Sequence, residues 1–192
     1  MLFLLAPALI AQAPAIPARK LEVLLDQLKA VGEATVQGRD SLAKIKAEKA
    51  ARAWGASRED IADLLDSETM EGVETQFSRM KDAAIAESAL AAMDASELLA
   101  RAAREGRPRL RMAAERACVR AFLMAKASRW SEMPDLPSAF NPLMSVSPRK
   151  KDVADKTKQV LQLHGNAVTL ENPEAASKAA QILFDSISLL EP

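Results

Sequence analysis

The feature that most constrains the fold is a pair of alanine-rich stretches between Ala83 and Trp130. Alanine has the highest helix propensity, and its small side chain lets neighbouring helices approach closely. The two stretches meet at Gly106-Arg107-Pro108. Proline suits the first position of a helix because its missing N–H costs nothing there. The pattern therefore predicts two closely packed helices, at about 72–104 and 108–125.

The composition also favours helices. Hydrophobic residues make up 49% of the 192 residues, but aromatic residues only 4%, and tyrosine is absent. The core must therefore be filled mainly by Ala, Leu, Met, Val and Ile, as in close-packed helices. Basic and acidic residues both number 26, so no net charge attracts the whole chain to nucleic acid or to a membrane surface. The length predicts one domain with appendages.

The first fifteen residues have the pattern of an export signal. An apolar run is followed by small residues in the order Ala-x-Ala, at 11–13 or 13–15. This is the order of the apolar region and the cleavage site in a signal peptide. The run is too short to cross a bilayer as a helix. We expect 1–15 to be a signal or transfer segment, and an apolar anchor that stays attached is the alternative.

Residues 16–75 are expected to form a helical extension. Apolar residues recur at helical spacing from Pro17 to Thr35, which predicts an amphipathic helix. Gly38 then interrupts the pattern, and a second helix is expected at 42–54. The apolar residues of the first helix are Leu21, Leu24, Leu28 and Val31.

The segment 47–65 also fits the spacing of a helix-turn-helix, with Gly55 in the turn. A recognition helix must face phosphates, but the second helix here would expose four acidic residues against a single Arg58. DNA binding is therefore only a remote alternative, and Ser57 is better explained as a helix N-cap. The four acids are Glu59, Asp60, Asp63 and Asp66.

Two further helices are expected after a proline-rich connection. Four prolines between Ser131 and Pro148 predict an extended loop. A helix follows at about 153–168. The tripeptide Asn172-Pro173-Glu174 then predicts the start of the last helix, because it combines an N-cap, a first-position proline and an acid at the positive end of the helix dipole.

Together these segments predict an all-α protein. Four helices with short or proline-rich connections give an up-down four-helix bundle at about 83–190, in a domain of residues 76–192. Residues 16–75 precede it as a helical extension. The last helix supports antiparallel packing, since its apolar residues repeat at intervals of four and three. They are Ala176, Ala180, Leu183, Ile187 and Leu190.

The sequence offers no group of residues suited to catalysis or to binding a metal or cofactor. The single histidine, His164, belongs to no His-x-x-x-His or Glu-x-x-His pattern. The single cysteine, Cys118, excludes an internal disulfide and a cysteine-based metal site. Glycine-rich phosphate loops and Gly-x-Ser-x-Gly motifs are absent. We therefore expect a protein that is not an enzyme and that holds no cofactor and no metal.

Basic residues gather near the hinge at Gly106-Arg107-Pro108. Seven arginines lie between Arg101 and Arg120, against two glutamates. One interpretation is a solvated face whose aliphatic stems cover the edge of the core. The other is a patch that binds carboxylates of a partner protein, for which the guanidinium group is suited. The predicted docking residues are Arg107, Arg109, Arg116, Arg120, Arg149, Lys150 and Lys151.

The order of motifs in 83–190 resembles the PsbQ family, extrinsic four-helix-bundle proteins of photosystem II. The run Ala-Ser-Glu-Leu-Leu at 95–99 comes first, followed by Arg107-Pro108 with Leu110 and an arginine-rich helix ending near Ala125. Ser147-Pro148 then leads to a lysine-rich helix, and Asn-Pro-Glu-Ala-Ala-Ser-Lys at 172–178 opens the last one. The resemblance covers a little over half of the chain, and 17–75 have no counterpart in it.

The resemblance implies a non-catalytic subunit that docks on the lumenal face of photosystem II and stabilises the oxygen-evolving complex. It implies no cofactor of its own, a location in the thylakoid lumen of a chloroplast, peripheral to the membrane, and no transmembrane helix in the mature chain. The alternatives are a secreted or periplasmic helical interaction module with an unknown partner and, more remotely, a helix-turn-helix regulator. We expect no binding to nucleic acid.

Overall fold

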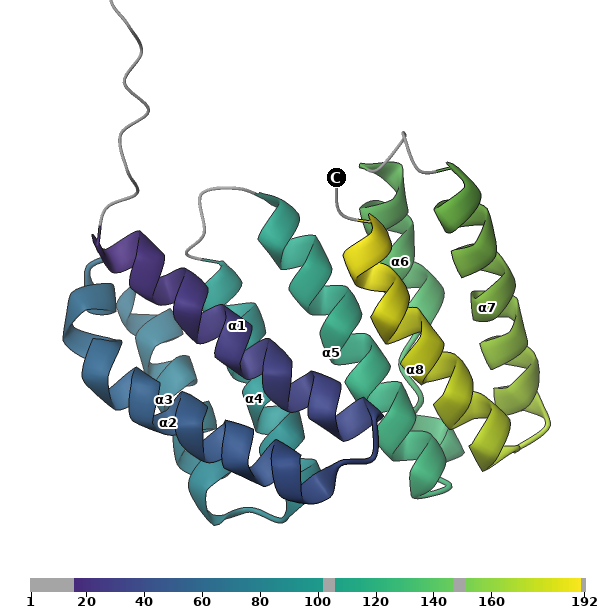
Figure 1. The fold of residues 1–192 in the computed structure, drawn as a ribbon, viewed down its shortest axis with the longest axis horizontal. Coiled ribbons are helices and arrows are strands. Elements are labelled where there is room, and N and C mark those ends of the chain that lie inside the picture. The colour runs from purple at the N-terminus through teal and green to yellow at the C-terminus, as the bar shows by residue number, and fades with distance from the viewer. Residues whose placement is uncertain (1–15, 102–105, 147–150, 191–192) are drawn as a thin grey trace, which may run out of the picture.

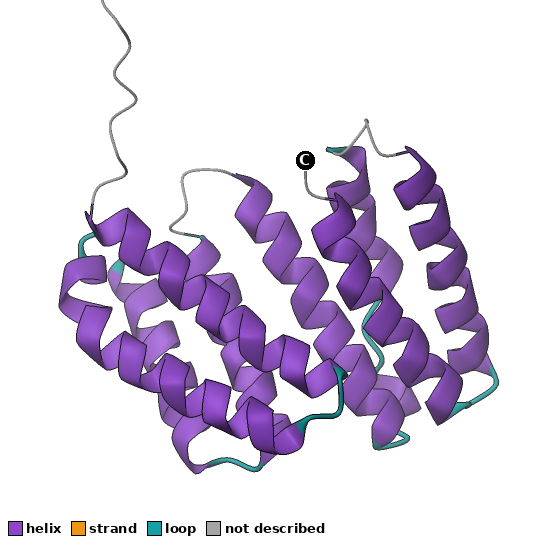
Figure 2. Ribbon diagram, in the orientation of Figure 1, coloured by secondary structure: helices purple, strands orange, loops and turns teal. Residues whose placement is uncertain are grey.

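The computed structural model describes residues 16–101, 106–146 and 151–190. Within these ranges every regular element is a helix, and short loops join them (Figure 2). The elements are α1 (Ile16–Val36), α2 (Asp40–Ala62), α3 (Ser67–Asp82), α4 (Ile85–Ala100), α5 (Gly106–Lys126), the 3₁₀ helix η1 (Trp130–Glu132), α6 (Leu136–Ser145), α7 (Lys151–Thr169) and α8 (Pro173–Leu190). The predicted all-α class is confirmed.

Helix α5 lies in the middle of the molecule. Helices α1 to α4 lie on one side of it and α6 to α8 on the other, and successive α-helices run in alternating directions (Figure 1). Helix α5 packs against α4 and α1 on the first side and against α8 and α6 on the second. The arginine-rich helix therefore joins the two halves of the fold.

Helix α1 contributes to the same core as the rest of the chain. It packs against α2, α4 and α5, and its Leu24, Leu28 and Val31 are almost fully buried. Gly32 allows the close approach, because a Cβ atom there would lie 2.9 Å from the Sδ atom of Met93 on α4. The helix predicted at 17–35 is confirmed.

The closed four-helix bundle predicted at 83–190 is not confirmed. Helix α4 packs against α5, α5 against α8, and α8 against α7, but α4 and α7 make at most marginal contact among the described residues. These four helices form an open row (Figure 1). Other helices cover the remaining sides of the row: α1 and α3 pack on α4, and α6 packs on α5.

The prediction of an extended loop at 131–148 was wrong. Helix α6 occupies Leu136–Ser145, and Leu136, Phe140 and Leu143 are buried. Asp135 caps the helix, because its carboxylate accepts a hydrogen bond of 3.3 Å from the backbone N–H of Ser138. One proline lies in the first turn, where its missing N–H costs nothing. Burial of the apolar residues outweighs the second proline inside the helix.

The single helix predicted at 72–104 is two helices. Helix α3 ends at Asp82 and α4 begins at Ile85, and Ala83 and Ala84 between them are extended, with ψ angles of 159° and 156°. The hydroxyl group of Ser88 donates a 3.1 Å hydrogen bond to the carbonyl oxygen of Met80 across this break. Antiparallel packing of α3 on α4 therefore overrides the helix propensity of the two alanines.

The helix breaks predicted at Gly38 and near Gly55 had different outcomes. Gly38 does end α1, with a left-handed φ angle of 67°, so that break is confirmed. The helix end predicted at Trp54 and the N-cap predicted at Ser57 were wrong, because α2 runs without interruption from Asp40 through Gly55 to Ala62. The helix-turn-helix is therefore not formed.

The start of the last helix at 172–174 is confirmed, and the side-chain oxygen of Asn172 accepts a 3.0 Å hydrogen bond from the N–H of Ala175.

Candidate docking surface

Arg116 on α5 binds two carboxylates of α4. Its Nε atom lies 2.6 Å from Oδ1 of Asp94, and one of its terminal nitrogens lies 2.7 Å from Oε2 of Glu97. The guanidinium group is partly buried at this junction. A residue that the sequence suggested for docking therefore holds two of the protein's own helices together.

The ion pairs of Arg116 continue into a chain across three helices. Arg79 on α3 reaches Asp94 at 3.9 Å and Glu87 at 3.2 Å, while Arg101 reaches Glu97 at 3.9 Å. The two acids in the middle, Asp94 and Glu97, are three residues apart and share a face of α4. Their spacing within an alanine-rich helix is the sequence signal for this contact, which was not among the predictions from the sequence.

Glu115 is a buried acid where α5 meets α1. Its side chain is 1% exposed, and its Oε1 atom lies 2.9 Å from Nε of Arg111 and 3.8 Å from Nζ of Lys29. A carboxylate in such a position needs positive partners, because burial of an unpaired charge is costly. Arg111 and Lys29 are therefore part of the fold at the α1–α5 contact.

Two of the predicted docking residues lie exposed on the described surface. Arg120 on α5 and Lys151 at the start of α7 form no ion pair with another described residue. The side chains of Arg107 and Arg109 lie outside the described part of the structure, as do residues Arg149 and Lys150.

The seven predicted residues are not all neighbours. Helices α5 and α7 begin at the same end of the molecule (Figure 1). Arg107 and Arg109 belong to the first turn of α5. Arg149 and Lys150 directly precede α7 in the sequence, and Lys151 is the first residue of α7. Arg120 lies 14 residues after the start of α5, a distance of about 20 Å at the rise of an α-helix. Arg120 therefore lies apart from the end of the molecule where α5 and α7 begin.

The remaining titratable groups singled out in the sequence are buried. Burial raises the pKa of the Cys118 thiol well above its usual range, and the negative charges of Glu115 and Asp185 add to this effect. Burial lowers the pKa of His164, whose Nε2 atom has no hydrogen-bond partner in the described structure. No group of three or more His, Cys, Asp or Glu side chains in 16–101, 106–146 and 151–190 is arranged to hold a metal ion.

None of the described helices is long and apolar enough to cross a membrane. The chain matches no known protein family, no curated protein and no solved structure.

Proposed function

We propose that this protein is a non-catalytic docking subunit that binds an acidic surface of a larger complex through the end where α5 and α7 begin. The observation that carries this proposal is that α5 and α7, which begin with basic residues or directly follow them in the sequence, both start at one end of the molecule (Figure 1). Exposed lysine and arginine side chains steer association with acidic partners and set its dependence on salt.

The motif order between 83 and 190 supplies the candidate partner. It supports the lumenal face of photosystem II as the acidic surface, with the protein in the thylakoid lumen, peripheral to the membrane, where it stabilises the oxygen-evolving complex. In this proposal α4, α5, α7 and α8 correspond in chain order to the four helices of a PsbQ-like protein, although here they form an open row. Arg120 extends the contact along α5, and Arg116 contributes to it only through the fold.

Salt washing of reconstituted membranes tests the proposal. The protein is added to thylakoid membranes from which the extrinsic subunits have been removed, and binding is followed by co-sedimentation. We expect it to bind at low salt and to be released near 1 M NaCl, because the screening length falls from about 10 Å at 0.1 M to about 3 Å at 1 M.

A matched pair of variants locates the contact. Neutralising the start of α7, with Lys150→Gln and Lys151→Gln, should lower the salt concentration needed for release. Lys156→Gln and Lys158→Gln remove the same charge from exposed positions further along the same helix and should leave release unchanged. Equal effects of the two pairs would contradict docking by this end of the molecule.

The partner itself is tested by separation of solubilised native complexes on a gentle gradient. Migration with photosystem II is the expected result. Salt-sensitive binding to other membranes, with no migration alongside photosystem II, would overturn the choice of partner and would favour the secreted or periplasmic interaction module.

A further inference from the structure

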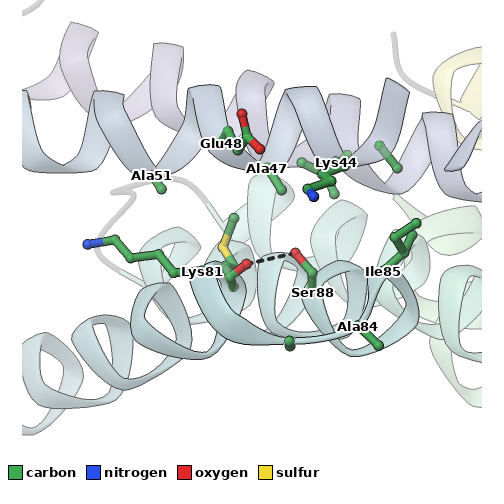
Figure 3. A pocket seen from close by; sticks show the side chains of 12 residues that line it. Lys44, Ala47, Glu48, Ala51, Lys81, Ala84, Ile85 and Ser88 are labelled. Atoms are coloured by element: carbon green, nitrogen blue, oxygen red, sulfur yellow. Dashed lines mark hydrogen bonds between the residues drawn. The ribbon is translucent and has the colours of Figure 1, made fainter. Parts of the chain in front are cut away.

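A cleft of about 320 Å³ lies between α2 and the connection from α3 to α4. The connection is at the opposite end of the molecule from the starts of α5 and α7 (Figure 1). Figure 3 shows α2 on one side of the cleft and the α3–α4 region on the other. Its volume is within the range of sites that hold small ligands, about 300–1,000 Å³. The cleft is thus separate from the proposed docking end.

Small side chains make the space. Ala43, Ala47 and Ala51 line the cleft from α2, and their spacing of four residues places them along one side of that helix. Opposite them, Ala83 and Ala84 are in extended conformation at the break between the helices. Because none of these five side chains extends beyond Cβ, they leave the space between α2 and the connection unfilled.

The buried part of the cleft wall is mainly apolar. Val31 and Met80 are buried beside it, and Ile85 is partly buried. Ser88 is a buried polar residue of the lining, but its hydroxyl group already donates to the carbonyl oxygen of Met80 (Figure 3). The interior therefore suits an apolar body that needs few hydrogen bonds.

The rim of the cleft is basic. Lys44 on α2 and Lys81 on α3 both line it, and neither ammonium group is in an ion pair with another described residue. In Figure 3 the ammonium group of Lys44 lies between α2 and α4, on the side of Ser88. Arg52 lines a shallow continuation of the cleft next to Ala51, also without an ion pair in the described structure. Glu48 is the acid of the lining, so positive charge dominates.

We propose that the cleft binds a small amphipathic anion. Its apolar body lies on the alanine side of α2, and its anionic head is attracted by the ammonium group of Lys44, while Lys81 adds positive charge at the Ala51 end of the rim (Figure 3). The proposal rests on two features that coincide here: an apolar space of ligand size, and cations at its rim that form no ion pair with another described residue and that outnumber Glu48, the acid of the lining. An anionic head supplies the missing charge, and a short hydrocarbon body fills the space that the alanines leave.

Decanoate is the probe for this site, and decanol and inorganic phosphate are its controls. Binding is followed through the backbone amide signals of the full chain in two-dimensional NMR. We expect decanoate to shift the signals of Ala47, Ala84 and Ser88 in a saturable way. Decanol lacks the charge and phosphate lacks the apolar body, so each should bind at least about tenfold more weakly than decanoate.

Two pairs of variants separate the charge of the rim from the space inside. Lys44→Gln with Lys81→Gln should weaken decanoate binding about tenfold, whereas Lys49→Gln, an exposed residue of α2 outside the cleft, should not. Ala51→Leu fills the cleft and should abolish binding. Ala56→Leu adds the same side chain at an exposed position of α2 and should leave binding intact.

Several results would overturn the proposal. One is an unchanged decanoate affinity of Ala51→Leu, provided that its amide spectrum shows a folded protein. Another is an equal loss of decanoate affinity in the double lysine variant and in Lys49→Gln. A third is a set of decanoate-induced amide shifts spread evenly over the surface of the protein. Binding to vesicles of phosphatidylglycerol without any binding of soluble decanoate would also contradict it, because the ligand would then be a lipid surface.

Discussion

At the scale of single residues, Glu115 shows how the arginine-rich helix uses its charge. The sequence places seven arginines around the hinge, which suggests a surface for partners. In the fold, Arg116 is bound to Asp94 and Glu97, and Arg111 is bound to the buried Glu115. Two of these seven arginines are therefore paired with acids of the same chain, where α5 meets α1 and α4.

We predict that Glu115→Gln lowers the free energy of unfolding by about 1–3 kcal/mol. The neutral amide leaves the guanidinium group of Arg111 and the ammonium group of Lys29 without the buried carboxylate that offsets their charge. The control is Glu87→Gln, which breaks a pair with Arg79 whose two side chains are 52% and 45% exposed. That change should cost less than about 1 kcal/mol. Urea titration measures both, and equal losses would contradict the prediction.

His164 should make stability depend on pH. Burial lowers its pKa in the folded state, whereas an unfolded histidine has a pKa of about 6.5. The unfolded chain therefore binds the proton more readily, so stability falls as the pH drops below about 6.5. We predict that His164→Leu loses less stability than the wild-type protein between pH 7.5 and pH 5.5.

The histidine can also be observed directly. Since His164 is the only histidine, its imidazole signal in proton NMR reports the folded pKa without assignment. A titration midpoint at or above the value of an unfolded histidine would contradict the prediction.

At the scale of elements, three helices end in the same way. Each has a residue with a left-handed φ angle after its last turn: Gly38 after α1, Ser128 after α5 and Glu171 after α7. The following N–H then bonds back to a carbonyl oxygen five residues earlier, as in Arg39 to Ala34. This motif satisfies carbonyl groups at a helix end. Glycine marks this motif in a sequence, so only Gly38 was recognised as a terminating residue, although the predicted ends near 125 and 168 agree with those of α5 and α7.

Two glycine-to-alanine changes should have opposite effects. Gly38→Ala forces a side chain into a left-handed conformation and should destabilise the protein by about 1–2 kcal/mol. Gly55→Ala lies inside α2, where an added Cβ would meet nothing, and should stabilise it by about 0.5–1 kcal/mol. Thermal unfolding followed by circular dichroism measures both. A shift of the melting temperature in the same direction for the two variants would contradict the placement of Gly38 at a helix end and of Gly55 inside a helix.

At the scale of the whole molecule, the question is whether 16–75 is a separate extension. Helix α1 packs against α4 and α5, and its Leu28 is fully buried. Helix α5 in turn packs against α8. Contacts of this kind couple the stability of distant helices, so we expect the chain to unfold in one cooperative step.

Leu28→Ala tests this coupling. The change should lower stability by about 2–5 kcal/mol. The two tryptophans report on opposite sides of α5: Trp54 stacks on Phe77, with ring centroids 5.1 Å apart, and Trp130 lies in η1. With either tryptophan replaced by phenylalanine, the remaining one gives a separate fluorescence transition. We predict that Leu28→Ala moves both transitions equally, and a shift of the Trp54 signal alone would show an independent extension.

The local signals in the sequence predicted most of the helices. The apolar spacing of Leu21, Leu24 and Leu28 gave α1, and Asn172-Pro173 gave the start of α8. The errors arose where local and tertiary preferences compete. Prolines suggested a loop where α6 forms, because the burial of Phe140 and its neighbours does not show in a count of prolines.

The candidate sites were predicted less well than the helices. The sequence identified basic residues but could not tell which of them meet an acid of the same chain, since Arg116 and Asp94 are 22 residues apart. The cleft beside Lys44 and Lys81 was not predicted at all. It depends on the distance between α2 and the α3–α4 connection, and alanine spacing alone is also typical of two helices in direct contact.

Local patterns in the sequence are enough to predict that the chain is helical, where most helices begin and end, and which residues carry charge. Helix propensity, capping and apolar spacing act within a few residues, so they can be read along the chain. Three features became visible only in the folded chain: Arg116 joins α4 and α5, α4 and α7 stay apart, and a cleft opens beside α2. These features depend on which surfaces meet, and packing between distant segments leaves no local pattern.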